Sequence, residues 1–170
     1  MLSKLDICML RSNLFLIVAL LLVWTPASAI EFPRTTRDYV KSTPYIAVVE
    51  VENVVSAPGG KNLVQYRVSV LEEWKGNLPG VIDIRIFSAS RVFQPSPILE
   101  GPGSRWVVFL GPRTNEGFYP LKSLHWGKIE LLEDASGDYW LARPVTGFGK
   151  SYEGKRLSLD QFRSLVKGNR

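Results

Sequence analysis

Cysteine is nearly missing from this chain: its 170 residues contain one, Cys8, and none follows it. The rest of the chain therefore has no disulfide, no thiol nucleophile and no thiolate ligand for zinc. Small extracellular domains of animals are often rich in disulfides, so an exported domain without cysteine is more typical of bacteria. We expect such a domain to be stabilised by the packing of its apolar side chains.

Histidine is equally scarce, since His125 is the only one. Zinc sites use several His or Cys ligands, and a catalytic triad needs a nucleophile beside its histidine. No Gly-x-Ser-x-Gly motif supplies that nucleophile. Glu133, Asp134 and Asp138 lie close together, but they lack the length and spacing of an EF-hand loop. We expect an acidic turn there, and a protein with no metal, no cofactor and no enzymatic activity.

No run of basic residues occurs, although 21 Lys and Arg outnumber 16 Asp and Glu and give a net charge of +5. A nucleic-acid-binding domain gathers its positive charge on one face or in one segment. The charge is scattered here, so nucleic acid is not an expected partner. A weak attraction to an anionic envelope is the most that this charge supports.

Only one long apolar run is present, at residues 14–24, and it is shorter than the roughly 20 residues of a membrane-spanning helix. Lys4 and Arg11 precede it, and Pro26 follows it with the small residues Ala27 and Ala29. This order predicts a secretory signal peptide over residues 1–29, cleaved after Ala29. The expected product is one domain, residues 30–170, that is secreted or periplasmic and has no membrane span.

Alternating apolar and polar residues predict a meander of three strands at 45–55, 63–74 and 81–87, with a hairpin connection at 75–80. Residues 105–110 are apolar after Arg105 and suit a strand that is buried on both faces. Further along, we expect a hairpin made of residues 127–132 and 139–143. Residues 157–167 have apolar side chains at helical spacing, with Ser158 or Asp160 as a possible cap.

These elements predict an all-β fold: a five- to six-stranded Greek-key barrel of the OB type with a short C-terminal helix. Closure would remove the exposed edges of a sheet this rich in valine and isoleucine. Residues 33–43 could form one short helix or an irregular lead-in, and residues 88–103, rich in proline and glycine, should form a long loop.

Three stretches, residues 45–54, 66–76 and 103–110, together resemble the exported barrel domains of the tissue inhibitors of metalloproteinases and the netrin-like modules. The likeness lies in a strand that runs into Lys75-Gly76 and in a later Gly-x-x-aromatic-x-x-Phe-Leu strand. It implies an OB-type barrel outside the cytoplasm. Those inhibitors chelate zinc through an N-terminal cysteine, whereas this mature chain should begin at Ile30, so the resemblance does not imply inhibition by that mechanism.

Two carboxylate pairs invite comparison with the acid and base of a glycosidase. Glu50 and Glu52 should share the outer face of a strand opposite Arg67, as ordinary cross-strand ion pairs. Glu72 and Glu73 are adjacent in a strand, so they should point to opposite faces. Both pairs are thus expected to be structural, and a small secreted hydrolase that uses carboxylates is only the third hypothesis.

The candidate ligand face is the outer face of the second and third strands with two nearby aromatic residues. It comprises Gln65, Arg67, Ser69, Asp83, Arg85, Tyr119 and Trp126. In OB barrels this face and the flanking loops commonly meet the ligand. The leading hypothesis is a non-catalytic domain that binds a protein or an envelope component; the alternatives are a carbohydrate-binding module and a solvated sheet face with no ligand.

Overall fold

The computed structural model describes residues 35–56, 63–87 and 99–169, all within the compact unit Phe32–Arg170. The signal peptide predicted for residues 1–29, with Ala27 and Ala29, lies outside the described residues. Among the described residues, no helix is long and apolar enough to cross a membrane.

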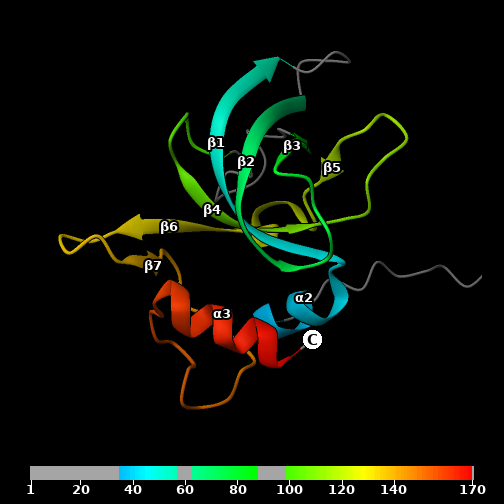
Figure 1. The fold of residues 1–170 in the computed structure, drawn as a ribbon. Helices are drawn as coiled ribbons and strands as arrows, with labels where there is room; N and C mark the ends of the chain where they lie inside the picture. The colour runs from blue at the N-terminus through cyan, green and yellow to red at the C-terminus, as the bar shows by residue number, and fades with distance from the viewer. Residues whose placement is uncertain (1–34, 57–62, 88–98, 170) are drawn as a thin grey trace, which may run out of the picture. The chain divides into compact units, whose positions relative to one another are not determined.

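Most of the regular structure is one mixed, seven-stranded sheet, as expected for a β-rich chain (Figure 1). Its strands are β1 (Tyr45–Ser56), β2 (Leu63–Lys75), β3 (Val81–Phe87), β4 (Arg105–Leu110), β5 (Tyr119–Pro120), β6 (Lys128–Glu133) and β7 (Tyr139–Leu141). Their order in the sheet is β5-β3-β2-β1-β4-β6-β7, and only the β3–β5 pair is parallel. The predicted meander and the second hairpin are confirmed.

The expected closed barrel is not what this strand order gives, because β5 and β7 lie at the two ends of the sheet. The segment around β5 nevertheless also touches β4. Gly111 N donates to Pro120 O at 2.9 Å, and Lys122 N donates to Phe109 O at 2.9 Å. These two hydrogen bonds flank an isolated antiparallel bridge between Leu110 and Leu121.

Two α-helices, α2 (Thr36–Ser42) and α3 (Leu159–Gly168), lie on one side of the sheet, and the short 3₁₀ helix η1 (Leu124–Gly127) precedes β6 (Figure 1). A capping box begins each α-helix, from Thr35 in α2 and from Ser158 in α3. The first of the two possibilities for residues 33–43, a short helix, is therefore the observed one. The predicted C-terminal helix is confirmed, with Ser158 as its cap.

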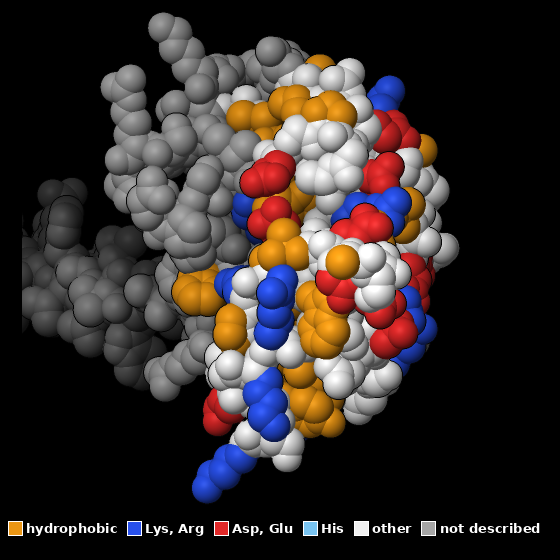
Figure 2. Space-filling view, turned by 90° about the vertical axis from the view of Figure 1, so that its left-hand side faces the viewer, with side chains coloured by type: hydrophobic (Ala, Val, Ile, Leu, Met, Phe, Trp, Pro, Cys, Tyr) orange, Lys and Arg blue, Asp and Glu red, His pale blue; other side chains and the backbone are white. Residues whose placement is uncertain are grey.

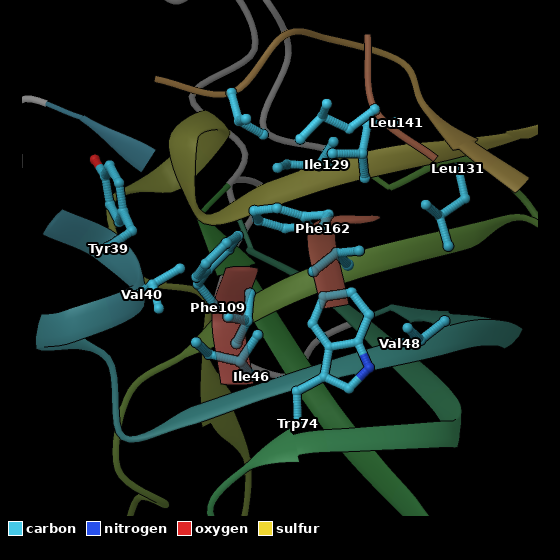
Figure 3. Packing of buried hydrophobic residues seen from close by; sticks show 14 residues of the cluster. Tyr39, Val40, Ile46, Val48, Trp74, Phe109, Ile129, Leu131, Leu141 and Phe162 are labelled. Carbon is cyan, nitrogen blue, oxygen red and sulfur yellow. The ribbon is translucent and has the colours of Figure 1, made fainter. Parts of the chain in front are cut away.

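Two hydrophobic cores lie on the two sides of the sheet, because alternate residues of β1 and β4 point in opposite directions. One core lies under the helices and includes Ile46, Phe109 and Phe162. The other is enclosed by the curve of the sheet and includes Val49, Tyr66 and Trp106. Figure 3 shows the first core, where the rings of Phe162 and Trp74 meet edge to face at 5.7 Å. The prediction that residues 105–110 form a doubly buried strand is confirmed, with Trp106 in the core as expected.

Candidate functional site

The outer face of β2 and β3 is the side opposite the enclosed core, and cross-strand pairing organises it. Register places Gln65 beside Arg85 and Arg67 beside Asp83. Arg67 Nε donates to Asp83 Oδ1 at 3.2 Å, and its Nη2 to Oδ2 at 3.4 Å. Asp83 raises the pKa of Arg67 through this hydrogen-bonded pair. Five of the seven predicted site residues therefore share this face, with Ser69 further along β2.

Arg85 is the most enclosed charged side chain of the outer face, with 13% of it exposed. Its Nη1 donates to Glu116 Oε2 at 2.6 Å, and its Nη2 donates to Gln65 Oε1 at 3.2 Å. The guanidinium lies 3.9 Å from the centre of the Phe118 ring. Arg85 thus joins β3 to the segment that leads into β5, and the sequence pattern did not indicate this contact.

Apolar side chains also reach solvent on the outer face. Val81, which pairs with Ser69 in register, is 50% exposed, and Val55, which pairs with Gln65, is 39% exposed. The alternation of the sequence predicts Val55 on the same face as the buried Val49 and Val51. That prediction is wrong because the register shifts between Val51 and Asn53, and such a bulge turns the following side chains to the other face.

A small cavity of about 110 Å³ lies at the edge of the outer face. It is lined by Arg67, Pro79, Val81, Ile82, Asp83, Arg113, Gly117 and Tyr119. Arg113 is new to the site. It lies 30 positions beyond Asp83 along the chain, and the parallel pairing of β5 with β3 brings its loop beside the outer face.

The two predicted aromatic residues do not form a shared platform. Tyr119 is 5% exposed and packs edge to face against Tyr45 at 5.5 Å, so it lines the small cavity but presents no open ring. Its place in β5 rather than in a loop explains this burial. Trp126 is 51% exposed on η1, with its ring over the Arg143 guanidinium at 5.0 Å.

The four carboxylates of the hydrolase hypothesis serve mainly as hydrogen-bond partners within the sheet and to α3. Arg105 Nε donates to Glu50 Oε2 at 2.7 Å, and the Ser69 hydroxyl donates to Glu52. In register, Glu50 lies between Ser69 of β2 and Arg105 of β4, and the bulge places Asn53 opposite Arg67. The expected register with Arg67 is therefore not observed, although the charge of Glu52 still acts on Arg67 and contributes to its raised pKa.

Glu72 and Glu73 point in different directions, as expected for neighbours in a strand. Arg163 Nε of α3 donates to Glu72 at 2.8 Å, whereas Glu73 accepts from Leu78 N at 2.6 Å. Partial burial raises the pKa of Glu72, but hydrogen bonds from Trp74 and Arg163 outweigh it and leave this pKa below its ordinary value.

The acidic turn between β6 and β7 is held by hydrogen bonds from donors within the same hairpin. Asp134 accepts hydrogen bonds from Ser136 N at 2.9 Å, Ser136 Oγ at 2.6 Å and Trp140 Nε1 at 2.8 Å. The bonds from Ser136 and Trp140 lower the pKa of Asp134 to about 2. Within the described ranges, no three His, Cys, Asp or Glu side chains are grouped as metal ligands.

A larger cleft, of about 390 Å³, lies between this hairpin and the start of α3. It is lined by Gly137, Asp138, Tyr139, Trp140, Ser158, Leu159 and Asp160. The indole hydrogen bond to Asp134 fixes the orientation of the Trp140 ring. Figure 2 shows the side of the molecule toward which the hairpin extends, where hydrophobic side chains lie beside charged ones of both signs.

Comparison with protein-family models, with curated proteins and with solved structures gave no match to this chain. The candidate site consists of a sheet face with paired charges, a small arginine-lined cavity at its edge and a separate aromatic cleft.

Proposed function

We propose that the chain is an exported, non-catalytic β domain that binds a protein partner through the outer face of β2 and β3. The observation that carries this proposal is that exposed valines share the face with charged side chains that already have partners of opposite charge. Val81 is half exposed, while Arg67 pairs with Asp83 and Arg85 pairs with Glu116.

The physical argument concerns what covering this face would cost. Removing an isolated charge from water is expensive, whereas a charge that keeps a hydrogen-bonded partner loses less. Burial of an exposed valine is favourable at about 25 cal/mol per Å² of apolar surface. A face of this composition resembles the mixed polar and apolar surfaces at which proteins associate.

We infer further that the sheet belongs to an OB-type barrel, in line with the resemblance to the netrin-like group. The inference is supported by the contacts of the β5 segment with both β3 and β4. In the proposed barrel, β1, β2, β3, β5 and β4 would form a ring from which β6 and β7 extend. The outer face would then be the surface that OB barrels commonly use for ligands.

A site-specific photocrosslinker at position 81 tests the proposed partner. The full chain with a benzoylphenylalanine in place of Val81 is expressed in cells that export it, and the adducts are identified by mass spectrometry. We expect one dominant protein adduct, and N-terminal sequencing of the bait should begin at Ile30. The matched control carries the crosslinker at Lys155, an exposed residue outside the face. Equal adducts at both positions, or none at 81, would contradict the proposal.

A carbohydrate-binding module is the second candidate. The cleft beside Trp140 suits it better than Trp126 and Tyr119, the two aromatic residues that the sequence offers for it, because Tyr119 is buried. A fixed indole next to Asp138 and Asp160 offers a stacking surface and hydrogen-bond acceptors. Affinity electrophoresis in soluble polysaccharides separates the possibilities. Retardation that Trp140→Ala abolishes and Trp126→Ala preserves would support the cleft.

The hydrolase hypothesis has the least support, because Glu50 and Glu52 each already bind a neighbouring side chain. If the purified protein does hydrolyse a polysaccharide, the double variant Glu50→Gln, Glu52→Gln should lose that activity. Full activity in the double variant would remove these two residues from consideration.

A further inference from the structure

The small cavity at the edge of the outer face combines two guanidinium groups with apolar walls. Among the residues that line it, Arg67 and Arg113 are the cations and Asp83 is the one carboxylate, while the charge of Glu52 acts on Arg67 from outside the cavity. Arg67 donates two hydrogen bonds to that carboxylate, at 3.2 and 3.4 Å, and its side chain is 56% exposed. Within the described part of the chain, Arg113 Nε donates a hydrogen bond to Gly117 O at 3.1 Å. Its two terminal nitrogens therefore have N–H groups that can donate to a ligand.

The size of the cavity limits what it can hold. Pockets for small molecules usually begin at about 300 Å³, and this one has a volume of about 110 Å³. It suits one head group rather than a whole ligand. Its walls include Pro79, Val81 and Ile82, which can pack against a short aliphatic stem.

The charge of the cavity defines the chemistry of that head group. Guanidinium groups bind carboxylates through parallel, charge-assisted hydrogen bonds. A cation would meet two arginines, and a neutral amide would leave the charge of the cavity uncompensated.

We propose that this cavity receives a glutamate or aspartate side chain of the protein that binds the outer face. The inference rests on the proposed function and adds the chemistry of the anchor. The carboxylate lies between Arg67 and Arg113, while neighbouring apolar residues of the partner cover Val81. Attraction between Arg67 and the new carboxylate competes with its pair to Asp83, so Arg113 makes the larger contribution.

The test uses two blocked peptides, acetyl-Ala-Glu-Ala-amide and acetyl-Ala-Gln-Ala-amide, titrated into the purified exported protein. Binding is followed by NMR through the Gly117 amide and the Nε–H signals of Arg67 and Arg113. The glutamate peptide should bind at least about tenfold more tightly than the glutamine peptide, because hydrogen bonds to charged groups are the stronger ones. Added salt should weaken it, since both arginines are solvent-accessible.

Matched variants separate the cavity from general charge effects. Arg113→Gln should weaken binding of the glutamate peptide by about tenfold. Lys155→Gln removes the same charge from an exposed position outside the cavity and should leave binding unchanged. Because Arg113 is exposed, the Arg113→Gln variant should fold normally and keep its amide spectrum. Arg113→Lys should bind with intermediate affinity, because an ammonium group cannot make the two parallel hydrogen bonds of a guanidinium group.

Three results would overturn the inference: equal binding of the two peptides, equal loss in Arg113→Gln and Lys155→Gln, or tighter binding of inorganic phosphate at the same signals. Failure here is distinguishable from failure of the proposed function. If a partner still crosslinks at position 81 but binds the Arg113→Gln variant normally, the outer face is upheld as the docking face and the acidic anchor is refuted.

Discussion

At the scale of single residues, Lys128 is the least expected feature, since lysine is rarely buried. It is 7% exposed at the start of β6, and its ammonium lies 4.3 Å from the centre of the Trp106 ring. Burial lowers the pKa of Lys128 to about 8, and the nearby Glu130 offsets part of this effect. The contact with Trp106 favours the cation, but loss of hydration outweighs it.

This buried lysine should make stability depend on pH. Between pH 8 and about 10.5 the unfolded chain still binds the proton that folded Lys128 has lost, so the free energy of unfolding should rise with pH. Urea titrations at several pH values across this window measure the slope. Lys128→Met should flatten it, whereas Lys155→Met, at an exposed position, should leave it unchanged. A slope that Lys128→Met does not alter would show that burial does not set this pKa.

At the scale of elements, the connection between β2 and β3 depends on one glycine. Gly76 has a φ of +99°, and a Cβ added there would lie 2.3 Å from Cδ1 of Tyr45. Gly76→Ala combines a left-handed backbone with a clash, so it should lower the free energy of unfolding by more than about 2 kcal/mol. Gly80→Ala is the matched control in the same connection, because nothing lies within 4 Å of its Cβ. Similar losses in the two variants, measured by urea denaturation, would refute this role of Gly76.

The first turn of α3 offers a second test at this scale. The Ser158 hydroxyl accepts from Gln161 N, and the Gln161 side chain accepts from Ser158 N at 3.1 Å. Ser158→Ala should therefore cost about 1 kcal/mol of stability. Ser151→Ala, at an exposed position in the preceding loop, should cost almost nothing. Thermal denaturation compares the two variants, and equal melting temperatures would show that the Ser158 cap does not stabilise the fold.

Sequence patterns were reliable for these elements wherever one residue type repeats at a fixed spacing. Ile82, Ile84 and Ile86 alternate through β3 and are all buried, as predicted. The pattern failed at Val55, because a bulge depends on the partner strand as well as on the sequence of β1. It also failed at Tyr119, whose strand of two residues is too short to show any period.

At the scale of the whole molecule, Phe162 joins the sheet to α3. It is fully buried, and its ring meets that of Trp74 edge to face with ring centres 5.7 Å apart (Figure 3). The Phe148 ring meets it edge to face at 6.1 Å between centres. Phe162→Ala should destabilise the fold by about 3–5 kcal/mol, because it removes a large ring and leaves a cavity. Phe162→Leu keeps most of the volume and should cost clearly less. Guanidinium denaturation measures the loss of unfolding free energy in both variants. Equal losses would show that the volume of the Phe162 side chain is not what stabilises the packing of α3 on the sheet.

The candidate site was predictable only in part. Gln65, Arg67, Ser69, Asp83 and Arg85 follow from alternation along two neighbouring strands, and the structure gathers them on one face. The second arginine of the cavity did not follow, because a loop has no periodic pattern and only the return of the chain through β5 brings Arg113 near Arg67.

The sequence by itself determined the β-rich composition, the meander and the C-terminal helix, since these depend on spacings within short segments. Only the tertiary structure decided which face of each strand the helices cover and which stays open. It also decided that the cavity pairs Arg67 with Arg113. The physical reason is that alternation defines two faces for every strand, but contacts between distant segments select the one that is buried.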